Sequence, residues 1–214
     1  MKKILIITAI AIVVIVLSYM IYEKSTGKKL INFGKKMMAA NTLVFANLIT
    51  SNKDAFLNKV ISVSDTIGLK NANHLMAVMY KESGLNPQAY NSNGGATGLI
   101  QFMPKTAVGL GTTTDALRKM SNVEQLDWVQ KYFIEIKKWT HKELNTYEDL
   151  YLATFFPAAL GKPDGYILET KTLHADTIAK ANKIIDLNGN LEITVGEFKE
   201  YCRRHLGASV VAKL

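Results

Sequence analysis

The sequence contains few cysteines, histidines and prolines, and these shortages exclude several classes of protein. Cys202 is the only cysteine, so the chain forms neither an internal disulfide nor a multi-cysteine zinc site. The four histidines are scattered, and no pair has the HExxH spacing of a helical metal site. With four prolines, 14 glycines and 48% hydrophobic residues among 214, the composition is globular rather than collagen-like or disordered.

Strand-like alternation is also scarce, and helical spacing takes its place. No segment alternates polar and apolar residues for long enough to predict a strong strand. Asn73 is expected to cap one of the helices, and residues 86–98, rich in Gly, Asn, Ser and Pro, predict a loop or a short irregular hairpin. The expected fold class is therefore mainly α. The predicted helices span residues 55–67, 74–83, 99–108, 115–120, 123–138, 147–156, 175–185 and 195–205.

The positive charge is concentrated near the start of the chain. The formal net charge is +8, yet residues 1–51 alone carry seven lysines and one glutamate. The remaining residues are close to neutral, so they lack the basic surface that nucleic-acid binding requires. We therefore expect no nucleic-acid partner.

Residues 4–21 form an apolar run without a charged side chain. As a helix, 18 residues span about 27 Å, close to the thickness of a bilayer core. A cleaved signal peptide is the alternative, but the run ends in Ser18-Tyr19-Met20-Ile21-Tyr22, without an A-x-A-like cleavage site. Tyr19 and Tyr22 fit the interfacial aromatic belt. We predict a transmembrane anchor at residues 1–22 and a basic juxtamembrane linker at residues 23–51.

Glu82 is the candidate catalytic residue. It lies in the last turn of a predicted apolar helix, where the helix dipole and apolar neighbours both disfavour a charged carboxylate. Both effects raise the pKa of the carboxyl, which is what a general acid for glycoside cleavage needs. The alternative for an isolated glutamate is an exposed residue near the end of the helix.

A glycine-rich segment follows Glu82 and adds the features of a ligand cleft. Gly94, Gly95 and Gly98 permit close backbone approach to a ligand, and Gln101 offers a donor and an acceptor to a sugar. Apolar residues that could form the walls of the cleft follow directly: Leu99, Ile100, Phe102 and Met103. The alternative is an ordinary glycine loop that enters a helix.

Two motifs here resemble the SLT-type lytic transglycosylases, which are related to goose-type lysozyme. The family pattern E-S-x-x-N-P appears as ESGLNP at 82–87, and G-A-x-G-L-M-Q-x-M-P-x-T-A appears as GATGLIQFMPKTA at 95–107. The resemblance covers roughly residues 52–165. It implies a lysozyme-like α fold and cleavage of the β-1,4 bond between N-acetylmuramic acid and N-acetylglucosamine in peptidoglycan strands.

By position, the resemblance assigns roles to individual residues. Glu82 matches the catalytic acid, which later acts as the base, and no cofactor is implied for catalysis. The residues that match substrate-binding positions are Ser83, Ser92, Gly98, Leu99, Ile100 and Gln101. Ile100 replaces the usual Met, and one residue is inserted between Glu82 and Ser92. The family's later A-Y-N-A-G motif is absent, and Phe155 or Phe156 would replace its tyrosine without the hydroxyl.

The implied mechanism uses a single carboxylate, assisted by the substrate's own N-acetyl group, and yields a 1,6-anhydro product. Attack by water would instead make the protein a lysozyme, and a non-catalytic glycan-binding scaffold is the rival from another class. Asp115, Asp127 and Asp164 are candidate second carboxylates, but nothing in their spacing selects one, and a solvated surface position is the favoured alternative for each.

Residues 186–197 fit the pattern of a calcium-binding EF-hand loop within an EF-hand-like module at 166–214. The expected ligands are Asp186, Asn188, Asn190, Glu192, Thr194 and Glu197. Leu191 replaces the glycine usual at position 6, where the turn requires a conformation that is costly for leucine. Structural calcium and a metal-free helix–loop–helix remain alternatives; a calcium-responsive adaptor is a further rival, which Leu191 disfavours.

The expected location follows from the anchor and the substrate together. The basic residues after the apolar run would place the C-terminal side in the cytoplasm by the positive-inside rule. Peptidoglycan cleavage instead requires the catalytic domain on the peptidoglycan side. We expect a membrane-anchored protein facing peptidoglycan, or a virion-associated one if a phage encodes it.

Overall fold

The computed structural model describes residues 18, 21–22, 24–26 and 42–214. By its internal contacts the chain divides into one unit at Met1–Thr42 and a second at Leu43–Leu214. No helix within the described residues is both long and apolar enough to span a bilayer. The predicted anchor at 1–22 falls largely outside the described residues. The predicted domain boundaries at 51/52 and 165/166 stay predictions.

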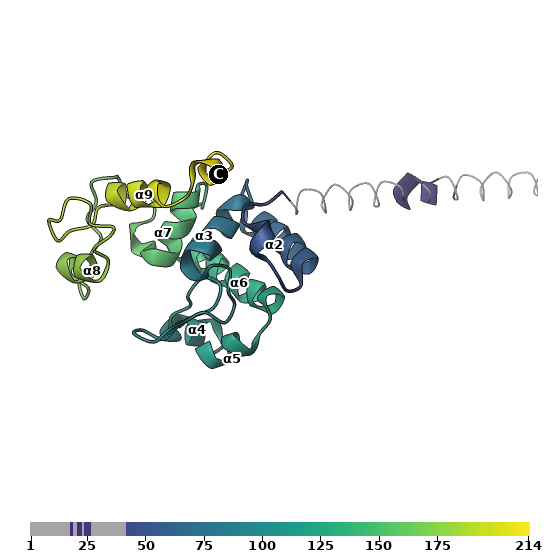
Figure 1. Cartoon of the computed structure of the whole chain (residues 1–214), viewed down its shortest axis with the longest axis horizontal. Coiled ribbons are helices and arrows are strands. Elements are labelled where there is room, and N and C mark those ends of the chain that lie inside the picture. The colour runs from purple at the N-terminus through teal and green to yellow at the C-terminus, as the bar shows by residue number, and fades with distance from the viewer. Residues whose placement is uncertain (1–17, 19–20, 23, 27–41) are drawn as a thin grey trace, which may run out of the picture. The chain divides into compact units, whose positions relative to one another are not determined.

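The second unit is mainly helical, as the sequence predicts (Figure 1). Its first half contains η1 (Ala46–Leu48), α2 (Lys53–Ile67), α3 (Asn73–Ser83), β1 (Tyr90–Asn91), β2 (Ala96–Thr97), α4 (Pro104–Leu110) and α5 (Thr114–Lys119). Its second half contains α6 (Asn122–Thr140), α7 (Tyr147–Phe155), η2 (Pro157–Ala159), α8 (Ala175–Ala181), α9 (Val195–Arg204) and α10 (Ala208–Val211).

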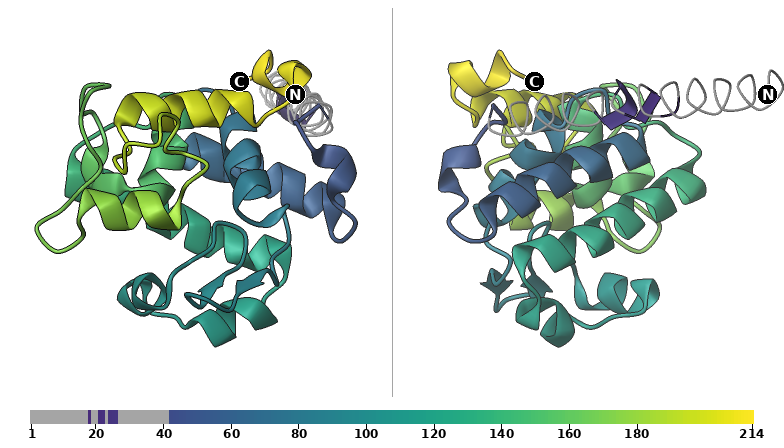
Figure 2. Two further views of the ribbon diagram at one scale, coloured as in Figure 1. Left: turned by 60° about the vertical axis from the view of Figure 1, so that its left-hand side comes forward. Right: turned by 90° about the vertical axis from the view of Figure 1, so that its right-hand side faces the viewer.

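Three helix pairs form the framework of this unit. α2 packs against α6, α3 against α7, and α7 against α9. The core contains fully buried side chains from several of these helices, including Phe56, Met76, Phe133 and Phe198. Figure 2 shows α9 along one side of the unit and the α4–α5 region at the opposite side. The helix α3, which carries Glu82, therefore packs between α2 and α7.

Capping residues explain where several helices begin and end. Ser121 and Glu124 form a reciprocal capping box at the start of α6, as do Thr194 and Glu197 at the start of α9. α2 ends as expected at Gly68, which has φ of 82° and donates its N–H to carbonyls of the last turn. These local bonds satisfy backbone groups that the helices leave unpaired at their ends.

Three sequence predictions about helix boundaries are wrong. The helix expected at 99–108 begins only at Pro104, because Gln101 has φ of 50° and proline is suited to the first turn. Asn73 does not cap α3; its side-chain oxygen accepts a hydrogen bond from the Val44 N–H (3.0 Å). The helix expected at 175–185 ends at Ala181.

Residues 86–98 form a short antiparallel hairpin, in which Tyr90 pairs with Thr97 and Asn91 with Ala96. The fully buried Gln125 of α6 holds this hairpin in place through its side-chain amide. Its side-chain oxygen accepts from the Leu99 N–H (3.0 Å), and its amide nitrogen donates to the carbonyls of Leu117 (2.8 Å) and Pro87. Gly98 has φ of 79°, and a methyl group there would overlap the Gln125 oxygen. The glycine-rich loop thus depends on one buried amide.

Replacing Gln125 with methionine tests this dependence. The substitution keeps the volume but leaves the Leu99 N–H and the Pro87 carbonyl without this partner, whereas the Leu117 carbonyl keeps its bond from the Met120 N–H (3.0 Å). We therefore expect a loss of about 3 kcal/mol of unfolding free energy. Chemical denaturation measures the loss, with Gln130→Met on the same helix as the matched control. An equal effect of the two substitutions would show that the amide does not organise the loop.

Candidate active site

Glu82 lies in the last turn of α3, where local geometry fixes its position. Gly84 follows with φ of 62°, and its N–H bonds to the carbonyls of Met79 and Tyr80, which ends the helix. The preceding residues of α3, from His74 to Met79, are all buried. Because α3 is buried up to its last turn, the partly buried Glu82 side chain lies at the edge of the core.

Burial dominates the electrostatics of Glu82. Loss of hydration raises the pKa of the carboxyl from its ordinary 4.5 to about 7, while the ammonium of Lys81 and a hydrogen bond with Thr154 both oppose the rise. At neutral pH the carboxyl is therefore divided between its protonated and ionised forms. That balance suits a group that first donates a proton and then accepts one.

Two tyrosines interact with Glu82 from other helices, one half-buried and one buried. Tyr132 of α6 and Tyr151 of α7 interact electrostatically with it, and burial raises the pKa of both phenols far above 10. Both phenols are therefore neutral near pH 7. The Tyr132 hydroxyl donates to the Ala153 carbonyl (2.6 Å), which places the α6 side chain against the end of α7. Among the described side chains with a resolved effect on the pKa of Glu82, only Lys81 is charged.

Thr154 of α7 contacts the Glu82 carboxyl. Its hydroxyl donates its single proton to the Tyr151 carbonyl (2.7 Å). In that orientation the Thr154 oxygen can accept from Glu82 only when the carboxyl is protonated. When the hydroxyl rotates and donates to the carboxylate instead, it stabilises the ionised form, and this is the interaction that lowers the pKa of Glu82. Thr154 can therefore serve both protonation states of the candidate acid.

Some of the other predicted site residues lie together near Glu82. Ser83 bonds to the carbonyls of Met79 and Leu99 (both 3.0 Å), and so connects the end of α3 to the glycine-rich segment. Ile100 and Gln101 line a cavity of about 30 Å³ together with Tyr132 and Thr154. This volume is enough for about one water molecule. The loop therefore approaches the side chains that surround Glu82.

The remaining predicted substrate residues have different surroundings. Leu99 is fully buried and packs as core, whereas Ser92 is exposed in the turn of the hairpin. Phe155 stacks on Phe198 of α9, with ring centroids 5.1 Å apart, and Phe156 is buried. The Phe155 ring therefore packs against the C-terminal segment, and its neighbour Thr154 is the residue that contacts Glu82.

The three candidate second carboxylates are exposed, and each pairs with a basic side chain. Asp127 pairs with Lys59 and Asp164 with Lys199, both at 2.6 Å, and Asp115 pairs with Arg118. These pairs are typical of solvated surfaces. The described site therefore centres on a single carboxyl group.

Sequence reasoning missed Thr154, Tyr132 and Lys81. The departure from the family motif at 153–159 directed attention to the phenylalanines beside Thr154. Nothing in the sequence around Tyr132 indicates a role at the site, since an aromatic residue on a helix most often packs in the core. Lys81 adjoins Glu82 in sequence, but adjacent helical residues do not face each other, so its influence on the carboxyl was not foreseeable.

The predicted EF-hand loop has a well-defined turn. Asp186 accepts from the N–H groups of Gly189 (2.8 Å) and Leu191 (3.0 Å), and Leu191 has φ of 65°. Leucine thus adopts the conformation normally given to glycine at this position. Beyond the turn, backbone bonds link Leu168 to Ile193 (2.8 Å) and Tyr166 to Val195 (2.9 Å).

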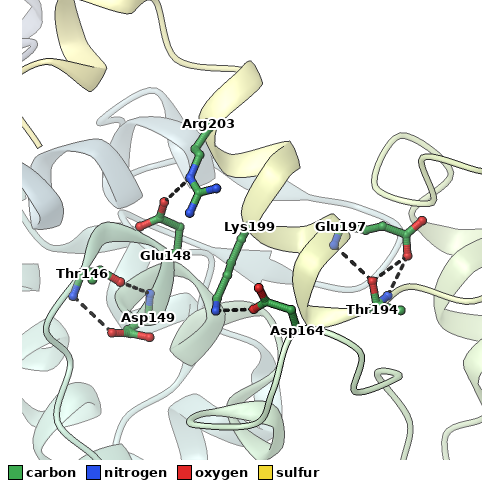
Figure 3. A network of polar contacts seen from close by, with 8 residues as sticks. All are labelled: Thr146, Glu148, Asp149, Asp164, Thr194, Glu197, Lys199 and Arg203. Atoms are coloured by element: carbon green, nitrogen blue, oxygen red, sulfur yellow. Dashed lines mark hydrogen bonds and ion pairs between the residues drawn. The ribbon is translucent and has the colours of Figure 1, made fainter.

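The last predicted ligand, Glu197, caps α9 (Figure 3). One of its oxygens accepts from the N–H and the hydroxyl of Thr194 (both 2.9 Å), and the other is buried without a partner. No three His, Cys, Asp or Glu side chains in the described ranges gather as a metal cluster. A cation in this loop would therefore also need amide and main-chain oxygens, the donor type that calcium accepts.

Replacing Glu82 with glutamine should stabilise the protein at high pH, because the variant has no carboxylate that must stay buried. Because the folded-state pKa of about 7 exceeds the ordinary 4.5, wild type loses stability as pH rises from about 4.5 to about 7. At pH 8 the variant should be more stable by on the order of 3 kcal/mol, and at pH 4 the difference should vanish. Denaturation at both pH values measures this, with the exposed Glu135→Gln as control. A less stable Glu82→Gln variant at pH 8 would contradict the burial argument.

Comparison with known proteins agrees with the two sequence motifs. Residues 60–127 match a family model described as the transglycosylase SLT domain. This region includes Glu82, the hairpin, the glycine-rich loop and Gln125, and it ends before Thr154 and the EF-hand-like loop. No curated protein and no solved structure matches the chain. SLT domains belong to lytic transglycosylases that act on peptidoglycan. Residues 60–127 therefore carry an SLT-type transglycosylase domain of the lysozyme-like superfamily.

Proposed function

We propose that this protein is a lytic transglycosylase that cleaves the β-1,4 bond between N-acetylmuramic acid and N-acetylglucosamine, with Glu82 as acid and then base. The observation that carries the proposal is the buried carboxyl at the end of α3, whose pKa of about 7 balances both protonation states. The SLT match around it supplies the substrate class. The proposed substrate contacts are Ser83, Ser92, Gly98, Leu99, Ile100, Gln101, Phe155 and Phe156.

The proposed reaction begins with protonated Glu82, which donates its proton to the glycosidic oxygen as the bond to the muramic C1 breaks. The substrate's acetamide oxygen stabilises the developing positive charge at C1. The Glu82 carboxylate then accepts a proton from the muramic C6 hydroxyl, whose oxygen attacks C1 and forms the 1,6-anhydro ring. Thr154 would accept from the acid in the first step and donate to the carboxylate in the second.

Digestion of purified peptidoglycan tests this function. We expect wild type to release muropeptides with 1,6-anhydro ends, and Glu82→Gln to release them at least about 100-fold more slowly, because a general acid contributes that much or more. Mass analysis of the products makes the measurement. Glu135→Gln, an exposed carboxylate paired with Lys138 (2.8 Å), is the matched control.

The products also separate the alternatives. Reducing ends that disappear in Glu82→Gln would identify a lysozyme, in which water attacks in place of the C6 hydroxyl. Equal, negligible release from wild type and variant would identify a non-catalytic glycan-binding scaffold. Release by Glu82→Gln at the wild-type rate would exclude Glu82 as the acid.

We further propose that the 186–197 loop binds a structural calcium ion. The specific observation in favour is Leu191, which adopts the positive φ that an EF-hand turn needs despite its side chain. A second observation is the buried Glu197 oxygen without a partner, which a cation could satisfy. The proposed ligands are Asp186, Asn188, Asn190, Glu192, Thr194 and Glu197. Because two of them are neutral amides, the affinity should be low.

Thermal unfolding of the full chain with increasing calcium tests this site. With a dissociation constant near 1 mM, 10 mM calcium should stabilise the protein by about 1.4 kcal/mol. Glu197→Gln should abolish the stabilisation while a glutamine can still serve the capping box. Glu200→Gln on the same helix is the matched control. No shift of the melting temperature at millimolar calcium would exclude the site.

The same proposal places the protein at a membrane. The apolar run at 4–21 would serve as its anchor, and the SLT domain would face the peptidoglycan, or the protein would be carried on a virion if phage-encoded. The lysines that follow the run would then lie on the peptidoglycan side. No nucleic-acid partner is proposed.

A further inference from the structure

The helix α9 lies outside the region that matches the SLT family, yet it packs against α7 and contacts Lys81, the residue before Glu82. Two ion pairs fasten it to the rest of the unit, Lys199 to Asp164 (2.6 Å) and Arg203 to Glu148 of α7 (2.9 Å) (Figure 3). Phe198 stacks on Phe155 next to Thr154. An ion pair and a ring contact therefore fix the position of α9 relative to α7.

Tyr201 extends from α9 toward the end of α3. Its side chain is nearly buried, and the Lys81 ammonium lies 5.0 Å from the centroid of its ring. Attraction between an ammonium and the face of a tyrosine ring stabilises such an arrangement. The ring is also packed against His205, with centroids 4.4 Å apart. Tyr201 thus offers Lys81 a fixed surface rather than a mobile one.

Without the Tyr201 ring, nothing in the helix itself would hold the Lys81 ammonium in this position. Consecutive residues on a helix point about 100° apart, so Lys81 and Glu82 do not face each other by virtue of their sequence. A lysine with a free four-carbon chain would extend into water, where its attraction to a carboxylate is screened. The contact with Tyr201 instead keeps the ammonium where it acts on Glu82.

We propose that Tyr201 is a positioning residue for the catalytic acid, because its ring fixes the ammonium of Lys81, the residue that precedes Glu82 in the last turn of α3. This inference rests on the proposed function of Glu82. It extends the catalytic unit from the SLT region into the C-terminal segment. It also gives α9 a role in the chemistry that is independent of whether the adjoining loop binds calcium.

The other groups that face Glu82 and Lys81 do not replace this effect. From α6 and α7, Tyr132, Tyr147 and Tyr151 are neutral, because burial raises the pKa of each phenol far above 10. From α9, burial likewise raises the pKa of the Cys202 thiol, which stays neutral. Glu148 is paired with Arg203. Of the described side chains with a resolved effect on Glu82, Lys81 is the only cation.

The test is a carbon NMR titration of the Glu82 carboxyl in the full chain, with the signal assigned by its loss in Glu82→Gln. Lys81→Met removes the cation, so the pKa of Glu82 should rise by about half a unit or more. Tyr201→Met removes the ring but keeps a buried side chain, and should raise the pKa in the same direction by less. Tyr201→Phe, which keeps the ring face, should leave it unchanged.

The double variant Lys81→Met/Tyr201→Met distinguishes positioning from general packing. If the ring acts through the lysine, the double variant should titrate like Lys81→Met alone. A further shift in the double variant, or no shift in either single variant, would overturn the proposal. Lys81→Met alters a partly exposed residue, so an unchanged pKa of Glu82 in this variant would still overturn the proposal if Tyr201→Met failed to fold.

The rate of muropeptide release against pH separates this inference from the proposed function. Activity needs protonated Glu82, so its alkaline limb should move to higher pH in Lys81→Met and Tyr201→Met, together with the NMR pKa. If the pKa of Glu82 shifts in both variants but the wild type releases no muropeptides, the role of Tyr201 is supported and the proposed function is refuted. Glu82-dependent release with an unmoved alkaline limb would support the function and refute the positioning.

Discussion

The burial of one ionisable carboxyl is the constraint on which the rest of this site depends. Removing Glu82 from water raises its pKa to about 7, and the surrounding groups are of the kind that tolerate a neutral acid. Two neutral phenols and a threonine hydroxyl provide polarity without charge, and the Lys81 ammonium limits the rise in the pKa of Glu82. A stronger positive neighbour would stabilise the carboxylate and remove the proton that an acid must donate.

A second constraint is the need to satisfy backbone groups in a loop rich in glycine. Gln125 provides this from a fully buried position, where its amide bonds to three backbone groups from segments far apart in sequence. Gly98 then becomes necessary for two reasons, since its φ is positive and the space for a side chain is taken by the amide. The loop conformation and the buried glutamine therefore require each other.

Much of this arrangement could be predicted from the sequence, because its signals are local. Apolar spacing predicted the helical fold, Gly68 and Gly84 end α2 and α3, and the ESGLNP and GATGLIQFMPKTA motifs indicated the SLT domain that the family match supports. The helix predicted at 99–108 begins too early, because two local features of the sequence oppose each other there. Residues 99–103 have helical apolar spacing, but the positive φ of Gln101 and the backbone bridge between Thr97 and Phe102 exclude a helix there.

The sequence by itself determined the helical framework, the candidate acid, the glycine-rich loop and the EF-hand-like pattern, since each depends on residues a few positions apart. Only the tertiary structure decided what surrounds the acid. Thr154, Tyr132 and Tyr201 come from three helices far from Glu82 in sequence, and packing of apolar faces brings those helices together. Desolvation and electrostatic contact depend on distance in space, so the pKa of Glu82 is a property of the folded unit and not of its motif.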